Sequence, residues 1–381
     1  MNTPVTAEAW RDAVRRHLPA AVELRHALHA APRLGGVESA TTQTVVDALG
    51  LGEGRTVAGT GRLLPVAPGP APVVLRAELD ALPVVEASGL PWASTNGAMH
   101  ACGHDVHLAG LAAVVMAAAD LDLPRPVTAL LQPREEGADS GARDVVADGA
   151  MDDVHAIVAA HVQPRLPAGT IAATPGPVNA ATDEFTVTVT GHGGHSGYPH
   201  TVDDSVLALS AIVVALQQVG ARRVDPTVGV ACMVNQLRAG TANNVVPSIA
   251  VGSGTVRTMR EQDRAVAHAA IRDIAQHVAA GHGCAAEVEI DVAEPPLLND
   301  PRLAVAAGEL LTGFGHEVDS SWRSFGSDDF SYYSAHTRSL MLFVGTGDER
   351  GGLHEATFWP DDDYVGVVAD ALIAGYCAAL R

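Results

Sequence analysis

The chain contains no lysine, and this absence excludes several classes of enzyme. All 24 of its basic residues are arginine. Enzymes that form a Schiff base with a substrate or with pyridoxal phosphate need a lysine amine, and so does the Walker-type phosphate-binding loop. A GC-rich coding sequence accounts for the arginine bias without a functional reason. The sequence therefore argues against these three kinds of site.

Cysteines are few and lie far apart, at Cys102, Cys232, Cys284 and Cys377. Without a C-x-x-C pair, they form neither a disulfide framework nor a zinc ribbon. The longest apolar run, 108–119, is too short to span a bilayer and is typical of a buried helix. The first residues lack a basic region followed by an apolar run, so no secretory signal is expected. We therefore expect a cytoplasmic protein.

Positive charge and aromatic side chains are both scarce. The formal net charge is -20, and aromatic residues make up 4% of the 381 residues. An acidic surface repels phosphate, which argues against nucleic acid and anionic membranes as partners. A chain of this length is long for one core, so two domains, or one domain with an insertion, are expected.

Strand and helix patterns alternate in the first part of the chain. We predict helices over 7–30 and 108–119 and strands over 72–77, 127–132 and 156–160. Such alternation indicates an α/β fold, with a mostly parallel sheet and helices on both faces. Ligand-binding groups in these sheets follow the carboxyl ends of strands. Glu135, Glu136 and His161 occupy positions of that kind.

The pattern changes near residue 177. Strands are predicted over 184–190, 232–237, 249–258 and 287–292, and helices over 206–219 and 264–280. The order strand-helix-strand-strand-helix-strand is that of a ferredoxin-like α+β unit. We therefore predict a catalytic domain formed by residues 1–178 and 294–381. Residues 179–293 would form a domain inserted into it.

The densest group of metal-ligand types is the segment 100–107, HACGHDVH. Cys102 and His104 stand two residues apart across a glycine, so both can reach one metal ion from a loop. A His-rich surface loop without metal is the alternative. A Cys-His protease that uses Cys102 as nucleophile is another, but flanking histidines favour ligation, which deprotonates the thiol.

Two adjacent carboxylates, Glu135 and Glu136, follow the strand predicted over 127–132. A dinuclear hydrolase needs one carboxylate on its metal and another as general base for the attacking water. Neighbouring glutamates in a turn can divide these tasks, although such a pair is often only surface charge. His161 and His354 follow as further candidates, each of which taken alone is an ordinary loop or structural histidine. The five candidate ligands together indicate a metal centre.

Other enzyme classes fit less well. The spacing Gly50-x-Gly52-x-Gly54 lacks the strand and helix that a dinucleotide-binding loop requires. The segment 194–198 is not the G-x-S-x-G elbow of a serine hydrolase, because Tyr198 stands at its last position. His354 is not part of an H-E-x-x-H zincin motif.

Several motifs together resemble the aminoacylase/carboxypeptidase superfamily, and most closely its branch of hippurate and auxin-conjugate amidohydrolases. They occur in family order over nearly the whole chain. They are RAELDALP at 76–83, HACGHD at 100–105, QPREEG at 132–137, His161-x-x-Pro164, GGHSGYPH at 193–200, ANNVVP at 242–247, GTVRT at 254–258, GSDDF at 326–330 and Leu353-His354.

The resemblance implies a role for each matching residue. It assigns metal ligation to Cys102, His104, Glu136, His161 and His354, and general-base catalysis to Glu135. It implies that His195 reaches the partner subunit's active site to stabilise the oxyanion, and that Asn244 and Arg257 bind the substrate carboxylate. The planar fork of an arginine suits that ligand. The inserted domain would be a lid that also forms a homodimer. Asp80 and Asp105 are candidates for orienting the ligands.

The implied reaction is hydrolysis of N-acyl amino acids with two divalent ions per chain. The Cys102 thiolate favours Zn, Mn, Co or Ni. A dipeptidase or carboxypeptidase with the same metal site, and an inactive metal-binding relative, remain alternatives. The chain departs from the family pattern at Glu78, where aspartate is usual, and at Arg33, where glutamate is usual.

Overall fold

The structure is a computed structural model that describes residues 7–66, 69–137 and 139–381. The chain divides into two compact units. The first unit runs to Gly176 and resumes over Leu298–Arg323 and Asp329–Arg381, and the second comprises Pro177–Leu297 and Ser324–Asp328. Each unit has its own hydrophobic core.

The first unit is built on an eight-stranded sheet in the order β1-β2-β4-β3-β5-β16-β6-β15. Its strands are β1 Arg55–Val57, β2 Gly61–Pro65, β3 Val73–Glu78, β4 Val127–Gln132, β5 Ala156–Gln163, β6 Thr170–Ala172, β15 Glu317–Asp319 and β16 Ser339–Gly345. The central strands β4, β3, β5 and β16 are parallel, and β1, β2 and β6 supply the antiparallel pairs. Every residue of these four central strands is buried, which explains their continuous apolar runs.

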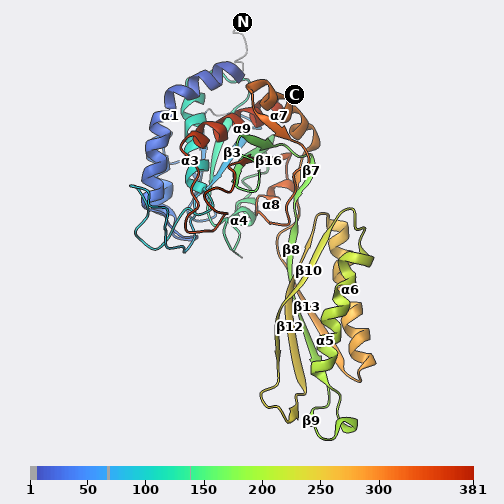
Figure 1. Cartoon of the computed structure of the whole chain (residues 1–381). Helices are drawn as coiled ribbons and strands as arrows, with labels where there is room; N and C mark the ends of the chain where they lie inside the picture. The colour runs from blue at the N-terminus through green and yellow to red at the C-terminus, as the bar shows by residue number, and fades with distance from the viewer. Residues whose placement is uncertain (1–6, 67–68, 138) are drawn as a thin grey trace. The chain divides into compact units, whose positions relative to one another are not determined.

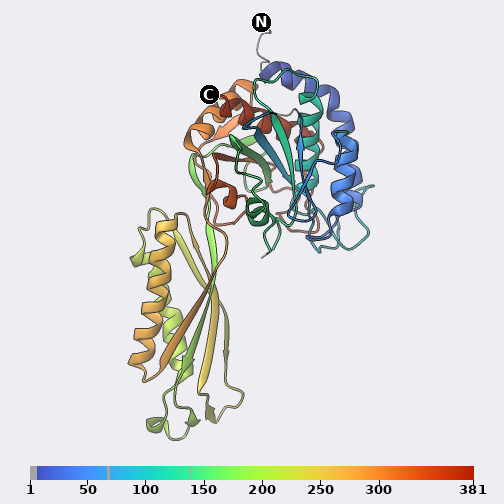
Figure 2. The ribbon, with the colours of Figure 1, turned by 180° about the vertical axis from the view of Figure 1, so that it is seen from behind.

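Helices cover the sheet of the first unit (Figures 1 and 2). They are α1 Ala7–Ala30, α2 Ser39–Leu49, α3 His104–Ala118, α4 Gly141–Ala147, α7 Pro301–Phe314, α8 Ser331–Ser334 and α9 Asp363–Ala379. The helix α3 is apolar on all sides and buried over almost its whole length, between the sheet, α1 and α9. Gly110 lets α9 approach closely, because a Cβ there would lie 2.5 Å from Val368 Cγ1.

The second unit is a four-stranded antiparallel sheet in the order β10-β12-β8-β13, with α5 and α6 side by side on one face (Figure 1). Its elements are β8 Ala181–Thr190, β9 Gly194–His195, α5 Ser205–Leu216, β10 Val230–Ala239, β11 Val245–Val246, β12 Ile249–Thr258, α6 Glu261–Gly281 and β13 Ala285–Val292. A 3₁₀ turn at Pro199–Thr201 and a π turn at Val219–Arg223 flank α5. The order and pairing are ferredoxin-like.

The chain passes between the units through β7 Gly176–Asn179 and β14 Leu297–Asn299. The predicted fold class, a mostly parallel α/β sheet with an α+β unit inserted, is confirmed. No helix in the part of the chain that the structure describes is long and apolar enough to cross a membrane.

Two local predictions need correction. The helix predicted over 108–119 begins four residues earlier, at His104, because Gly103 turns the chain directly into it. The strand predicted over 156–160 continues to Gln163, so His161 lies within β5 and not after it. The parallel pairing of β5 with β16 extends through these residues, and His161 pairs with Phe343.

Candidate metal centre

Cys102 and His104 are presented by a tight turn at the start of α3. Gly103 between them has φ 85°, in the left-handed region that favours glycine. A Cβ at this position would lie 2.4 Å from Val162 Cγ2, so the turn also packs closely against β5. Both flanking side chains are buried. The glycine of the motif is therefore needed for conformation and for space.

The His104 ring is oriented by the backbone of Asp80. Its Nδ1–H donates to the Asp80 carbonyl oxygen at 2.8 Å, and its Nε2 has no hydrogen-bond partner among the described residues. Burial lowers the pKa of His104, but the carboxylates of Glu78, Asp80 and Glu136 outweigh it and raise the pKa overall. A histidine that donates one nitrogen to a carbonyl and leaves the other for a cation is the usual arrangement of a metal ligand.

His161 is oriented in the same way. Its Nδ1 lies 2.6 Å from the Val162 carbonyl oxygen, and its Nε2 lies 3.5 Å from Cys102 Sγ. Burial lowers the pKa of His161 to about 3, so the ring is neutral at physiological pH. Metal ligation requires the neutral imidazole.

Glu135 and Glu136 lie in a turn after β4 that Asp80 fixes. The two backbone N–H groups donate to the two oxygens of the Asp80 carboxylate, at 3.0 Å for Glu135 and 2.9 Å for Glu136. Arg134 before them has φ 50° and Gly137 after them has φ 101°. The Glu135 carboxylate comes within 3.7 Å of His104 Nε2. Asp80 therefore connects His104, through its carbonyl, with both glutamates, through its carboxylate.

His354 joins the group from the loop before α9. Its backbone N–H donates to the Ala101 carbonyl oxygen at 2.8 Å, which brings it next to the segment that carries Cys102. Its Nε2 lies 3.3 Å from Glu136 Oε1, and the side chain is half exposed. His354 has φ 68°, a conformation that a residue with a side chain adopts only when its surroundings impose it.

The charge of the group fits a bound cation. Burial raises the pKa of the Cys102 thiol well above its usual range, and the Glu136 and Glu135 carboxylates raise it further. Cys102, His104 and Glu136 offer ligand atoms within 4.8 Å of one another. His161 adjoins them through Cys102, and His354 adjoins them through Glu136. Sulfur, imidazole and carboxylate ligands in this set are typical of transition-metal sites.

A second buried group, Glu78, His104, His107 and His161, also brings ligand atoms within 4.8 Å of one another. Both nitrogens of His107 are engaged, however. Its Nε2 accepts a hydrogen bond from the Val162 N–H at 2.9 Å, and its Nδ1 lies 2.8 Å from Glu78 Oε2. Burial opposes ionisation of Glu78, but Arg76 and His107 lower its pKa well below the usual range. These residues therefore support the backbone beside His161.

Asp105 does not contact the ligand cluster through its side chain. Its carboxylate accepts hydrogen bonds from Arg25 Nε at 3.1 Å and His29 Nδ1 at 3.0 Å. Burial opposes ionisation, but Arg25 and His29 hold the pKa of Asp105 far below its usual range. The network links α3 to α1, so Asp105 has a structural role that its place in the motif did not indicate.

The candidate residues of the second unit lie at two separate places. His195 and Asn244 lie together, because β9 pairs with β11 and the Ser196 N–H donates to the Asn244 carbonyl oxygen at 3.1 Å. Both side chains are exposed. The Gly197 N–H donates to His195 Nδ1 at 3.0 Å, so the neutral ring carries its proton on Nε2. His195 is thus able to donate a hydrogen bond.

Arg257 is far from Asn244 within one chain. It lies near the end of β12, and its Nη1 donates to the Phe325 carbonyl oxygen at 2.7 Å. The β9-β11 pair lies beyond the other end, where Ile249 starts β12. Eight residue steps along the strand separate Ile249 from Arg257, about 26 Å at the usual rise. One substrate carboxylate can contact both Asn244 and Arg257 only if two copies of the chain supply them.

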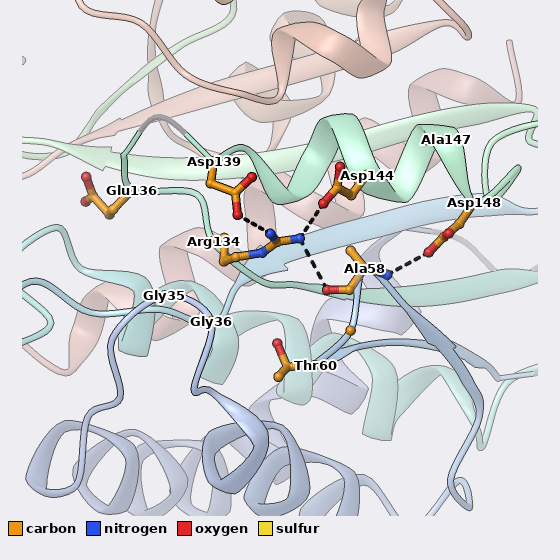
Figure 3. Close-up of a pocket in the computed structure, with 11 residues that line it drawn as sticks. Gly35, Gly36, Ala58, Thr60, Arg134, Glu136, Asp139, Asp144, Ala147 and Asp148 are labelled. Atoms are coloured by element: carbon orange, nitrogen blue, oxygen red, sulfur yellow. Dashed lines mark hydrogen bonds and ion pairs between the residues drawn. The ribbon is translucent and has the colours of Figure 1, made fainter.

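A pocket of about 670 Å³ adjoins Glu136 on the first unit (Figure 3). Its lining includes Gly35, Gly36, Thr60 and Arg134. In Figure 3 the Arg134 side chain points into the ion pairs that hold it, and the Glu136 side chain points away from them. The turn therefore directs the side chains of Arg134 and Glu136 to different sides.

The fold and this ligand set define a metal-dependent hydrolase. The model of peptidase family M20/M25/M40 matches residues 74–372. The chain belongs to this family, and it is a metal-dependent amidohydrolase.

Two named relatives support this family assignment. N-acetylcysteine deacetylase of Bacillus subtilis strain 168 is 34% identical over 287 residues, which cover 74% of this chain and 75% of the relative. Thermostable carboxypeptidase 2 of Saccharolobus solfataricus is 30% identical over 372 residues, 93% of this chain and 94% of the relative.

Solved structures agree with these relatives. A protein of methicillin resistant Staphylococcus aureus described as an aminohydrolase superposes with a TM-score of 0.91 at 26% identity, over 99% of this chain and 100% of the other. A dinuclear metal-binding peptidase of the M20 family from Bacillus subtilis gives 0.82 at 28% identity, over 96% and 98%.

Proposed function

We propose that the protein hydrolyses the amide bond of N-acyl amino acids and releases a carboxylic acid and a free amino acid. The observation that carries the proposal is the position of Glu135. Its carboxylate lies beside His104 Nε2, and its backbone is fixed by the same Asp80 that orients His104. Two relatives named as deacetylases of N-acetyl amino acids support this choice of substrate class.

Two divalent transition-metal ions per chain would be held by Cys102, His104, Glu136, His161 and His354. Zn, Mn, Co and Ni suit a set that includes a thiolate. When bound, such ions polarise the scissile carbonyl and lower the pKa of the attacking water.

Glu135 would act as the general base and then as the general acid. It takes a proton from the water as the water oxygen bonds to the carbonyl carbon. It then gives a proton to the amide nitrogen as the C–N bond breaks, so that the amino acid leaves as a neutral amine. The backbone N–H groups of Glu135 and Glu136 take no part in the reaction. Their hydrogen bonds to Asp80 therefore remain in place during both proton transfers.

The second unit would bind the rest of the substrate. His195, with its proton on Nε2, would donate a hydrogen bond to the carbonyl oxygen as negative charge develops there. Asn244 and Arg257 would bind the carboxylate of the amino-acid part. Because the β9-β11 pair lies beyond one end of β12 and Arg257 lies near the other end, we assign His195 and Asn244 to one subunit and Arg257 to its partner.

A homodimer follows from this arrangement, and one edge of the second unit suits it. The edge strand β10 exposes Met233 and Leu237, and the neighbouring helix α5 exposes Leu207 and Val214. A long, partly apolar edge strand favours pairing with a second strand. A small-molecule substrate and a second copy of the chain are therefore the proposed partners.

A dipeptidase or carboxypeptidase is the second candidate, supported by the carboxypeptidase relative from Saccharolobus solfataricus. The metal ligands are the same for both candidate activities, so only the preferred substrate separates them.

A substrate panel tests the proposal. Enzyme loaded with Mn²⁺ or Zn²⁺ is incubated with N-acetyl, N-benzoyl and indole-acetyl amino acids and with dipeptides, and the released amine is measured. We expect the highest kcat/KM for an N-acyl amino acid. Turnover of dipeptides alone would support the second candidate, and no turnover of any compound by fully loaded enzyme would contradict both.

A further inference from the structure

Three consecutive backbone N–H groups in the turn after β4 are each bound by a carboxylate oxygen. Asp80 accepts from Glu135 and Glu136, and Glu38 Oε1 accepts from Arg134 at 2.9 Å. Glu38 is completely buried and lies just before α2, 96 residues away in the sequence. Its other oxygen accepts a hydrogen bond from Thr60 Oγ1 at 2.8 Å.

Arg134 is the residue of this turn whose conformation needs support. It has φ 50°, which an L residue with a side chain adopts only at a cost in free energy. Its N–H bonds to Glu38, and its carbonyl oxygen accepts from the Gly141 N–H at 2.9 Å. Its guanidinium pairs with Asp139 at 2.5 Å and with Asp144 at 2.6 Å (Figure 3). Both the backbone and the side chain of Arg134 are thus bonded to neighbouring groups.

The left-handed conformation of Arg134 sets the direction of the Glu135 and Glu136 side chains. A change of Arg134 to the common right-handed conformation would rotate the chain that enters Glu135 and Glu136. The Asp80 contacts could then no longer form with both N–H groups. The side chains of Arg134 and Glu136 leave the turn in opposite directions (Figure 3), as the present conformation requires.

We propose that Glu38 is a positioning residue of the active site, which holds Arg134 in the left-handed conformation and thereby sets the direction of Glu135 and Glu136. The proposal rests on the function proposed above for these two glutamates. The side chain of Glu38 contacts the turn through the Arg134 N–H, so Glu38 would act through the backbone of Arg134.

The test compares two double variants that differ only in their backbone preference. Glu38→Ala is combined with Arg134→Gly and, separately, with Arg134→Ala. Both doubles lose the guanidinium pairs, but glycine adopts positive φ freely and alanine does not. For Glu38→Ala alone we expect kcat to fall roughly 10- to 100-fold, as for other small misplacements of catalytic groups. The double variant with Arg134→Gly should have a kcat at least roughly fivefold above that of the double variant with Arg134→Ala, with KM nearly equal.

Equal kcat in the two doubles, or a Glu38→Ala kcat within about twofold of the parent enzyme, would overturn the proposal. Glu38→Gln, which keeps one oxygen for the Arg134 N–H, should lose less kcat than Glu38→Ala. Thr60→Ala removes the other contact of Glu38 and serves as the matched control. If Glu38→Ala does not fold, Glu38→Asp replaces it, because the shorter side chain withdraws the oxygens and keeps the charge.

Failure of the proposed function gives a different result. In that case Glu135→Gln would leave turnover unchanged in the parent enzyme, whatever the Glu38 variants do. If Glu135→Gln abolishes turnover while the two double variants have equal kcat, only the proposed role of Glu38 is wrong.

Discussion

At the scale of single residues, two buried histidines and two glutamates of the cluster are oriented by groups outside the proposed ligand set. His104 is turned by the Asp80 carbonyl, His161 by the Val162 carbonyl, and the two glutamates by the Asp80 carboxylate. Nitrogen, sulfur and carboxylate atoms thus converge without relying on a bound ion for their direction. Prior orientation of this kind reduces the reorganisation that binding and catalysis require.

Removal of the Cys102 thiol should lower the metal content. Cys102 lies between His161 and the His104–Glu136 pair, so its loss would remove a ligand atom from the middle of the proposed set. We expect Cys102→Ala to retain fewer than the two ions per chain of the parent enzyme, as determined by elemental analysis after dialysis. Cys232→Ala, at a buried cysteine of the second unit, is the control. An unchanged metal content in Cys102→Ala would show that the thiol is not a ligand.

Sequence alone could indicate residues that lie in short motifs, including the supporting residue Asp80, but not supporting residues outside those motifs. Cys102 and His104 stand two apart, and Glu135 and Glu136 are adjacent, so residue type and spacing made each pair a candidate. The role of Glu38 could not be predicted from the sequence, because its partner Arg134 is 96 positions away. His107 belongs to the same motif as His104, but only the contacts with Val162 and Glu78 reveal its role.

At the scale of elements, the turn before α3 depends on Gly103. Gly103→Ala combines an unfavourable φ with a close approach of Cβ to Val162, and we expect a loss of about 2–4 kcal/mol in the free energy of unfolding. Gly36→Ala is the matched control, since Gly36 has the same φ of 85° and no atom within 4 Å of its Cβ. Urea unfolding of both variants measures the difference. Equal losses would show that contact with Val162 does not matter.

The pairing of Asp183 with α6 should make the second unit sensitive to acid. Burial opposes ionisation of Asp183, but Arg264 and His268 lower its pKa, with Arg264 Nε donating at 2.8 Å. A carboxyl with a lowered pKa in the folded state stabilises above its ordinary pKa, near 4, and this contribution is lost as the pH falls further. Asp183→Asn should lose roughly 3 kcal/mol at pH 7.

The measurement is the free energy of unfolding of the parent and of Asp183→Asn between pH 3 and pH 7. The two curves should converge towards the acid end. The exposed Asp47→Asn is the control, and its curve should follow that of the parent. A constant difference between parent and Asp183→Asn over this range would contradict a lowered pKa.

Elements were predictable where periodicity was clear. The strand over 127–132 and the strand over 249–258 agree with β4 and β12 at both ends. The errors occurred where a strand or helix continued through polar residues. His161 and Gln163 are buried in β5 by pairing with β16, and His104 begins α3, because tertiary contacts override local preference.

At the scale of the whole molecule, catalysis should depend on a second copy of the chain. We expect the parent enzyme to sediment as a dimer, and Met233→Arg with Leu237→Arg on β10 to sediment as a monomer. The monomer should keep its metal and lose most of its turnover, because His195 would no longer reach a partner's substrate. Val292→Arg, exposed on the opposite edge strand β13, is the control. A monomer with full turnover would refute catalysis across the subunits.

The most direct test of the account is the turnover of Glu135→Gln loaded with metal, with N-acetyl-L-cysteine and the best substrate of the panel. The substitution keeps the shape of the side chain and removes its ability to take a proton. We predict that the variant binds as much metal as the parent, and that kcat falls by at least roughly 10²-fold, the usual contribution of a general base. Undiminished turnover at equal metal content would contradict the proposed role of Glu135 and, with it, the mechanism.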